Sequence, residues 1–283
     1  MRILIYGHRG WIGQKLAALC DAPLRGQARV DDVEAVGREL DALAPERVIC
    51  CVGRTHGPGC GTIDYLEGRL RENVRDNLFA PLALALQCQA RGVHLTYLGT
   101  GCIFAYDDAG AQFVESDEPN FFGSGYSIVK GFTDRLVQQL PHVLNVRIRM
   151  PITDEVHPRN FITKIAQYAK ICSMPNSMTV LDDLLPMMVD MCRQGTTGTV
   201  NLCNPGVMTH NEILALYRDI VDPTFTWANF SPEEQDELLA AGRSNNHMDT
   251  TLLASRYPHV RPLREAVIAA LQRMASRPAQ TAA

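Results

Sequence analysis

The 283-residue chain is predicted to form an α/β fold, with a doubly wound, mostly parallel sheet and a smaller C-terminal lobe. Three observations support this prediction. Short apolar runs end at glycine, amphipathic helical stretches alternate with them, and a glycine-rich turn follows the first run. Strands and helices that alternate along a chain are typical of a parallel sheet covered on both faces. The length exceeds that of a usual single-domain core, which favours an added lobe.

The first half of the chain carries the clearest pattern. Its apolar runs predict buried strands, and apolar residues at helical spacing predict the helices between them. The expected strands cover residues 2–6, 47–52, 93–98 and 143–148. The expected helices cover residues 11–20, a segment from 33 onward, 63–91, and 122 to about 140.

The second half is less regular. Strands are predicted over 177–181 and 199–202, and helices are predicted to begin at Thr209 and at Ser231-Pro232. The expected organisation is a dinucleotide-binding domain, a substrate lobe and a flexible tail. These parts cover residues 1–150 (with returning strands near 177–202), residues 151–176 with 203–275, and residues 276–283, respectively.

Composition limits the class of protein. A net charge of -4 gives no general attraction for nucleic acid or for an anionic membrane surface. No apolar run has the length of a membrane span, and the apolar start is too short for a signal peptide. The nine cysteines are odd in number and never form C-x-x-C, so we expect neither a disulfide framework nor a zinc site. A reducing, cytoplasmic location is expected.

A glycine-rich turn follows the first strand. Gly7, Gly10 and Gly13 form G-x-x-G-x-x-G between a strand and a helix, the context in which such glycines bind a pyrophosphate. A merely structural turn is the alternative, and this context makes it less probable. The pattern predicts a Rossmann-type domain. The expected cofactor-binding residues are Gly7, Arg9, Gly10, Trp11, Ile12, Gly13, Val52 and Gly53, joined by Tyr126 and Lys130.

The nature of the dinucleotide rests on the charges that follow this turn. Asp31 and Asp32 lie where an acidic residue holds the ribose of NAD, but they also directly precede a helix and suit its capping. Basic side chains near the expected ribose favour the 2'-phosphate of NADPH, with NADH as the alternative. These side chains are His8, Arg9, Arg25 and Arg29.

A second motif carries reductase chemistry. Tyr126 and Lys130 form Y-x-x-x-K on a predicted helix, which puts both side chains on one face. An ammonium beside a phenol is expected to lower the pKa of that phenol. Thr100 follows a buried strand, where its hydroxyl can hold a substrate carbonyl beside the tyrosine. A surface Tyr-Lys pair is the alternative when the motif is taken alone.

These motifs resemble the extended short-chain dehydrogenases/reductases. Nearly the whole chain is further similar to the bifunctional nucleotide-4-keto-6-deoxyglucose 3,5-epimerase/4-reductases of rhamnose synthesis. The similarity covers residue 2 to the last helix. It rests on residues 99–104 (GTGCIF), 147–152 (RIRMPI), 158–165 (PRNFITKI), 175–182 (PNSMTVLD), 204–207 (NPGV) and 243–246 (RSNN).

The resemblance implies a second chemistry in the same pocket, in which protons on C3 and C5 are removed and returned. It implies that Cys102 and Lys164 are the acid/base pair, without deciding which abstracts each proton. It also implies substrate contacts by Asn160, Arg243 and Asn246. A buried cysteine, a solvated lysine and a helix N-cap are the ordinary roles of such residues.

The expected reaction is NADPH-dependent conversion of UDP-4-keto-6-deoxy-D-glucose to UDP-L-rhamnose, with dTDP as the other possible carrier. A separate 4,6-dehydratase is expected to supply the keto sugar, and the family implies a homodimer. A simple 4-ketoreductase is the near alternative, since it needs neither Cys102 nor Lys164. A non-catalytic dinucleotide sensor is the distant one, since it does not need Thr100, Tyr126 and Lys130 together. The segment between Cys20 and Asp31 is short, which predicts a trimmed second strand.

Overall fold

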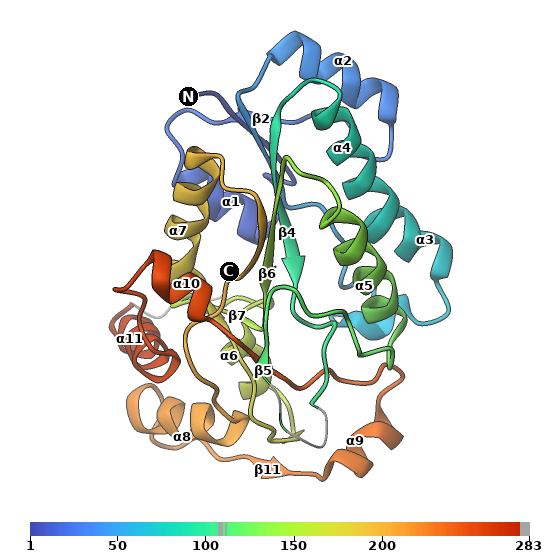
Figure 1. Cartoon of the computed structure of the whole chain (residues 1–283). Coiled ribbons are helices and arrows are strands. Elements are labelled where there is room, and N and C mark those ends of the chain that lie inside the picture. The colour runs from blue at the N-terminus through green and yellow to red at the C-terminus, as the bar shows by residue number, and fades with distance from the viewer. Residues whose placement is uncertain (107–109, 111, 278–283) are drawn as a thin grey trace.

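A six-stranded, all-parallel sheet forms the centre of the protein in the computed structural model, which describes residues 1–106, 110 and 112–277. The strand order is β10-β6-β4-β3-β1-β2, and the predicted parallel sheet is therefore confirmed (Figure 1). The strands are β1 (Ile3–Tyr6), β2 (Leu24–Arg25), β3 (Arg47–Cys50), β4 (His94–Thr100), β6 (Val143–Ile148) and β10 (Gly198–Asn201). The second strand has only two residues, as its short connection predicted.

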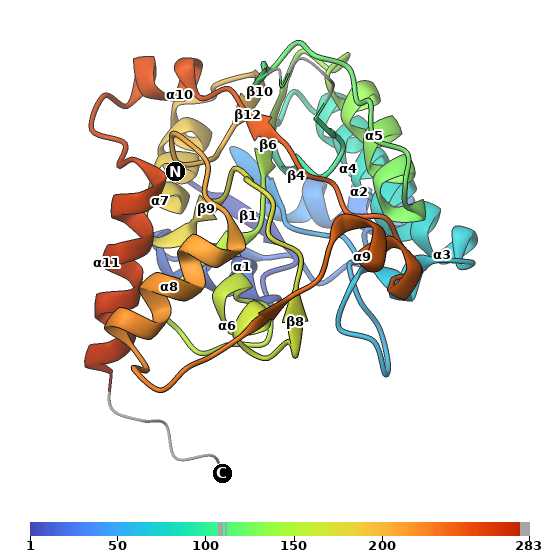
Figure 2. The same ribbon diagram turned by 90° about the horizontal axis from the view of Figure 1, so that it is seen from below.

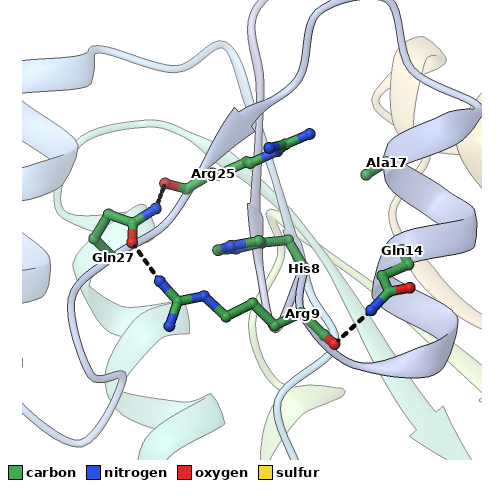
Figure 3. A pocket seen from close by; sticks show the side chains of 6 residues that line it. All are labelled: His8, Arg9, Gln14, Ala17, Arg25 and Gln27. Atoms are coloured by element: carbon green, nitrogen blue, oxygen red, sulfur yellow. Dashed lines mark hydrogen bonds between the residues drawn. The ribbon is translucent and has the colours of Figure 1, made fainter.

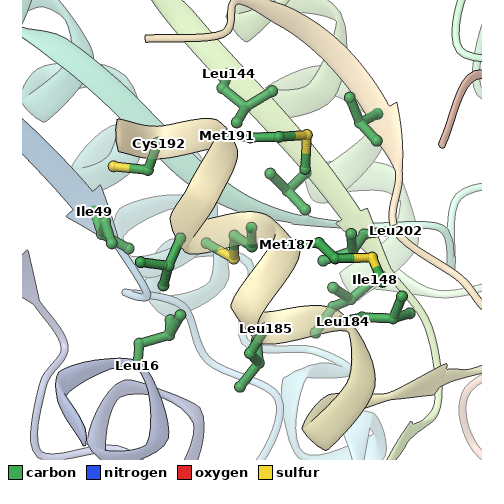
Figure 4. Close-up of a cluster of buried hydrophobic side chains, with 14 of the residues drawn as sticks. Leu16, Ile49, Leu144, Ile148, Leu184, Leu185, Met187, Met191, Cys192 and Leu202 are labelled. Carbon is green, nitrogen blue, oxygen red and sulfur yellow. The ribbon is translucent and has the colours of Figure 1, made fainter. Parts of the chain in front are cut away.

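Both faces of this sheet are buried. Along β1, Ile3 and Ile5 enter one apolar core while Leu4 and Tyr6 enter the other, because successive side chains point to opposite faces. One face is covered by α1 (Trp11–Ala18) and α7 (Leu181–Gln194), whose leucines and methionines pack against the strands (Figure 4). The other face is covered by α2 (Val33–Leu43), α4 (Ala80–Gln89) and α5 (Gly125–Val137).

The single helix predicted over 63–91 is wrong, because this segment is broken. A 3-10 helix (Ile63–Leu66) ends before Gly68, whose φ of +71° is a left-handed conformation that ends helical structure. The chain then continues through α3 (Leu70–Val74), a π-helical turn (Arg75–Phe79) and α4. Within the π turn, Asn77 bonds to both backbone groups of Arg54, which ties this irregular turn to the loop after β3.

The remaining elements lie below the sheet or beside its lower end in Figure 1 and are seen from below in Figure 2. An apolar core joins three of the helices, namely α6 (Phe161–Ala166), α8 (His210–Ile220) and α11 (Leu263–Ser276). The shorter helices are α9 (Pro232–Leu238) and α10 (Thr251–Arg256). Three small parallel pairs complete this region: β5 (Gln112–Phe113) with β12 (His247–Met248), β7 (Pro151–Ile152) with β9 (Thr179–Val180), and β8 (Lys170–Ile171) with β11 (Ala228–Asn229).

Two second-half predictions need correction. The strand predicted near 177–181 is only β9, which pairs with β7 outside the main sheet, whereas β10 does join that sheet. Ser276, the first residue of the predicted tail, belongs to α11, and residues 278–283 of that tail lie outside the described residues. Capping boxes at Thr209 and Ser231 confirm the predicted starts of α8 and α9. In the described part of the chain, no helix is both long and apolar enough to cross a membrane.

Candidate active site

The glycine turn lies between β1 and α1, at the point where the strand order reverses. Gly7 has a φ of +83°, and a Cβ atom on Gly13 would lie 2.1 Å from the Gly7 carbonyl oxygen. Only glycine permits this tight turn and this close packing. The first-turn amides of α1 have no intrahelical acceptor, and they form an anion-binding end beside the turn.

A cavity of about 510 Å³ opens beside this turn (Figure 3). His8, Arg9 and Arg25 supply basic groups to it, and none of the described residues that line it is a carboxylate. Arg9 donates to the Gln27 amide oxygen at 3.0 Å, which holds one guanidinium at the wall. The Nδ1 atom of His8 is buried without a partner among the described residues. A basic cavity with an unsatisfied nitrogen fits an anionic group such as a ribose phosphate.

The acidic residues after β2 have structural roles. Asp32 caps α2 by accepting a hydrogen bond from the Ala35 amide at 3.0 Å. Asp31 forms an ion pair with Arg29, so Arg29 is engaged there and does not line the cavity. The helix-capping interpretation of Asp32 is confirmed, and Arg29 is removed from the group of cavity-lining cations.

The other predicted cofactor residues are distributed around this turn. The indole of Trp11 stacks on His157, with ring centroids 4.9 Å apart, and Ile12 packs against the core under α7. Both side chains are partly buried against this core. Val52 and Gly53 lie in the loop after β3, one residue beyond its end, and β3 is the neighbour of β1 in the sheet.

Thr100 and Tyr126 meet at the carboxyl end of β4. Thr100 is the last residue of the strand, Tyr126 lies in the first turn of α5, and the adjacent Ser127 hydroxyl ties that turn to the Cys102 carbonyl. Burial raises the pKa of Tyr126, the nearby charge of Cys102 raises it further, and the Thr100 hydroxyl opposes both. The phenol is therefore protonated at neutral pH and can donate a proton.

Lys130 differs from the prediction. Its ammonium donates to the hydroxyl of Tyr97 on β4 and does not act as the main influence on Tyr126, so the expected lowering of the Tyr126 pKa is wrong. The physical reason is that burial outweighs the neighbouring charge. Burial also lowers the pKa of Lys130 to about 8.

Cys102 lies beside this group, but for a different reason than predicted. The chain turns after β4 instead of continuing as a strand, and the Cys102 amide donates to the Thr100 hydroxyl at 3.1 Å. The Ser127 hydroxyl donates to the Cys102 carbonyl at 2.7 Å, which fixes this turn against α5. The sulfur lies 3.7 Å from a guanidinium nitrogen of Arg149.

Lys164 lies on α6, outside the main sheet. Its ammonium donates to the Gly61 carbonyl at 3.3 Å, in the glycine-rich loop before the 3-10 helix. Burial lowers the pKa of Lys164, and the charges of Arg159 and Arg243 lower it further. A neutral amine and an ammonium are thus closer in free energy here than on an exposed lysine.

The predicted substrate residues make strong contacts with the chain itself. Asn160 is buried as the N-cap of α6, and its amide donates to the carbonyls of Thr153 and Glu155. Asn246 is also buried and donates to the Gly101 carbonyl at 2.9 Å, holding the turn that carries Cys102. Both amide groups are therefore engaged in positioning backbone.

Arg243 forms an ion pair with Asp64 at 2.5 Å. Asp64 also accepts from the Ala241 amide at 3.0 Å, and it therefore ties the segment before β12 to the 3-10 helix. Asp64 was not predicted as a partner, because no pattern in the sequence links two residues so far apart. Tyr97 and Arg149 were not predicted either, although Arg149 follows a buried strand just as Thr100 ends one.

The fold and this group of residues define a class of protein. Residues 1–186 match the RmlD substrate binding domain family, and the chain belongs to this family. The resemblance to the reductases of rhamnose synthesis is thereby confirmed.

Relatives with known names cover nearly the whole chain. A bifunctional dTDP-4-dehydrorhamnose 3,5-epimerase/dTDP-4-dehydrorhamnose reductase from Arabidopsis thaliana is 42% identical and covers 94% of this chain and 90% of its own. The crystal structure of the L780 UDP-rhamnose synthase from Acanthamoeba polyphaga mimivirus is 52% identical, with a TM-score of 0.94 over 97% of this chain and 99% of its own. A Bacillus anthracis dTDP-4-dehydrorhamnose reductase in complex with NADP is 18% identical with a TM-score of 0.80 over 96% and 98%, and shares the fold.

Proposed function

We propose that the chain is a bifunctional 3,5-epimerase and NADPH-dependent 4-ketoreductase that converts UDP-4-keto-6-deoxy-D-glucose to UDP-L-rhamnose. The observation that carries this proposal is the grouping of Thr100, Cys102 and Tyr126 at the end of β4. A reductase needs the hydroxyls, and only an epimerase also needs the thiol. The near full-length similarity to rhamnose-forming enzymes supports the same conclusion.

In the proposed reduction, Tyr126 donates its phenolic proton to the oxygen on C4, and the Thr100 hydroxyl orients that oxygen. NADPH supplies the hydride. Lys130 keeps a positive charge near the reacting oxygen at neutral pH. In the proposed epimerisation, Cys102 and Lys164 exchange protons with C3 and C5 before the reduction.

NADPH is the proposed cofactor, with NADH as the weaker substrate. The basic cavity beside Gly7 and Gly10 supports this choice, because it offers His8, Arg9 and Arg25 to a 2'-phosphate and no carboxylate to a ribose hydroxyl. The residues proposed to bind the cofactor are Gly7, Arg9, Gly10, Trp11, Ile12, Gly13, Val52, Gly53, Tyr126 and Lys130. Residues 1–150, with the returning segment near 177–202, are proposed as the dinucleotide-binding part, and residues 151–176 with 203–275 as the substrate lobe.

The proposed substrate carries a diphosphate, and a basic group on the lobe side suits it. Arg159, Lys164 and Arg243 lie close enough for their charges to act on one another, with Asp64 as the carboxylate paired to Arg243. Asn160 and Asn246 are proposed to shape this site. A separate 4,6-dehydratase is proposed to supply the keto sugar. The trifunctional Arabidopsis thaliana relative named for that dehydratase activity is 41% identical and is matched over 41% of its length.

A homodimer in the cytosol is proposed. The helices α4 and α5 and the π turn before them leave large apolar side chains exposed, which suits a helical interface between two copies. These are Phe79, Leu86, Phe132 and Leu136. A reducing compartment suits the nine cysteines, which are all free thiols.

The proposed reaction is tested by supplying UDP-4-keto-6-deoxyglucose with NADPH or NADH and determining the product by NMR. The expected product is UDP-L-rhamnose, formed with one NADPH oxidised per sugar and more slowly with NADH. A 6-deoxy product that keeps the D-gluco configuration at C3 and C5 would make the chain a simple ketoreductase. Product formation without any NADPH oxidation would contradict the reductase assignment.

A further inference from the structure

Arg149 is a buried arginine at the edge of the proposed active site. It directly follows β6 and is 1% exposed. Its guanidinium donates to the Gly101 carbonyl at 3.3 Å, to the Ser244 hydroxyl at 2.9 Å and to the Ser244 carbonyl at 2.5 Å. It also donates to the Asn176 side-chain oxygen. All these acceptors are neutral.

The charge of Arg149 has no carboxylate partner among the described residues. Arg147, two residues earlier and also buried, shows the usual solution, since Asp134 pairs with it at 2.6 Å. A buried cation without an anion is costly in free energy. In addition, the Nε atom of Arg149 lacks any partner in the described structure.

Cys102 is the group beside this cation that can become an anion. Its sulfur lies 3.7 Å from a guanidinium nitrogen, and the Gly101 carbonyl that Arg149 also binds belongs to the same turn. The other ionisable groups whose charges act together with that of Cys102 are Tyr126 and Lys130 on α5 and Cys203 after β10. Burial lowers the pKa of Arg149, and the charge of Cys102 is the largest influence in the opposite direction.

We propose that Arg149 is a positioning residue for epimerisation, whose buried charge stabilises the thiolate of Cys102 and holds its sulfur toward the sugar. This inference rests on the proposed function, in which Cys102 exchanges protons with C3 and C5. A guanidinium within hydrogen-bonding distance favours a thiolate over a thiol. Arg149 therefore acts through Cys102 and needs no contact with the substrate.

The proton balance of this step is simple. The thiolate sulfur takes a proton from a carbon next to the ketone, an S–H bond forms, and the C–H electron pair becomes the enolate. The ammonium of Lys164, the other member of the proposed pair, delivers a proton to the opposite face and restores the C–H bond, and the resulting amine regains a proton from solvent. Cys102 then loses its proton to solvent and the thiolate returns beside Arg149. The sugar is isomerised and nothing is oxidised.

The first test measures the alkylation rate of Cys102 against pH by peptide mass spectrometry in the full chain. Arg149→Met removes the charge, Arg149→Lys keeps it, and Ser244→Ala removes hydrogen bonds while leaving the charge in place. We expect the Cys102 curve to move to higher pH in Arg149→Met, with alkylation slower by at least about tenfold at neutral pH. The curves of Arg149→Lys and Ser244→Ala are expected to stay near that of the wild type. Cys60, on the glycine-rich loop, is the internal reference.

An unmoved curve in a folded Arg149→Met protein would overturn the proposal. An equal movement in Ser244→Ala would also overturn it, because loss of structure rather than of charge would then be the cause. If Arg149→Met does not fold, Cys102→Asp and Cys102→Asn test the same charge from the other side. The Asp variant is expected to melt at a higher temperature than the Asn variant at pH 7. This advantage should fade as the pH falls through the depressed pKa that Arg149 gives the new carboxylate. Equal melting temperatures at pH 7 would contradict an unpaired cation at this position.

A separate readout distinguishes this proposal from the proposed function. If Arg149→Met moves the alkylation curve and slows deuterium exchange at C3 and C5 more than it slows reduction of UDP-4-keto-L-rhamnose, both proposals hold. If the curve moves but Cys102→Ala still exchanges at the wild-type rate, Arg149 activates the thiol but Cys102 is not an epimerisation residue. The second result would overturn the epimerisation role while leaving the Arg149–Cys102 interaction intact.

Discussion

At the scale of single residues, burial decides the protonation of the proposed reductase pair. Tyr126 and Lys130 lie on one face of α5, but each has a different neighbour on β4, Thr100 for the phenol and Tyr97 for the ammonium. Burial disfavours the charged form of both groups, so it raises the pKa of Tyr126 and lowers that of Lys130. Tyr126 is therefore protonated over the physiological pH range and can donate its proton. Of the two residues, Lys130 is the one whose pKa lies nearer to that range.

The pKa of Lys130 predicts the alkaline limb of the reductase activity. Lys130 carries its charge below about pH 8 and loses it above, so kcat/KM for reduction should fall as the pH rises through that value. Tyr97→Phe removes the acceptor of the ammonium and thus disfavours the charged form. We expect the limb of this variant to move to lower pH in steady-state pH profiles. If the alkaline limb of Tyr97→Phe stays at the wild-type pH, Lys130 is not the group whose titration causes it.

At the scale of elements, the connection between a strand and its next helix determines what each end of the sheet binds. The turn from β1 to α1 exposes helix amides, and the short β2 brings Arg25 to the same cavity (Figure 3). The turn after β4 carries Thr100 and Cys102 to α5. Both turns lie at carboxyl ends of parallel strands, where ligands bind in open α/β sheets.

The position of Arg25 on β2 predicts a preference for NADPH over NADH. Arg25→Ala removes a cation from a cavity proposed to hold the 2'-phosphate, and a charge-assisted hydrogen bond contributes about 1.5–3 kcal/mol. We therefore expect KM for NADPH to rise by at least about tenfold while KM for NADH changes little. Initial rates with each cofactor provide the measurement, and Arg29→Ala is the matched control because Arg29 is paired with Asp31 outside the cavity. An equal rise in KM for NADPH and NADH would show that Arg25 does not bind the 2'-phosphate.

The pairing of α5 with β6 predicts an effect on stability. Asp134 on α5 accepts from Arg147 on β6 at 2.6 Å, and both side chains are buried. Asp134→Ala leaves Arg147 charged and unpaired, which typically costs about 3–5 kcal/mol. Chemical unfolding should show this loss, whereas the exposed pair of Glu118 and Arg135 should contribute less than about 1 kcal/mol. Similar losses at the two pairs would contradict the role of burial.

At the scale of the whole molecule, the exposed apolar side chains of α4 and α5 predict a dimer. Phe132→Glu and Leu136→Lys place charges on this surface, and we expect either variant to behave as a monomer in sedimentation at micromolar concentration. Phe122→Glu changes another exposed apolar residue, which lies before α5, and serves as the control. A monomeric wild type, or a dimer that survives both substitutions on α5, would exclude this interface.

Sequence patterns predicted the parts of the fold that depend on local rules. The parallel sheet, the glycine turn and the starts of α8 and α9 follow from periodicity, close packing and capping, so each was predicted correctly. The break at Gly68 and the π turn were not predicted, because Asn77 stabilises them through a contact with a distant loop. The partners of Lys130, Arg243 and Cys102 also come from other segments. Residues that are remote in sequence therefore supply the contacts of the site residues, and no local pattern predicts them.

The central claim is that one pocket performs both epimerisation and reduction. The most direct test follows the wild type and Cys102→Ala in heavy water by NMR, each with UDP-4-keto-6-deoxyglucose and NADPH. The wild type should yield UDP-L-rhamnose with deuterium at C3 and C5, and the variant should lose this product by at least about a hundredfold. The variant should still reduce pre-formed UDP-4-keto-L-rhamnose at a rate near that of the wild type. A wild-type product without deuterium at C3 and C5, or full epimerisation by Cys102→Ala, would contradict the account.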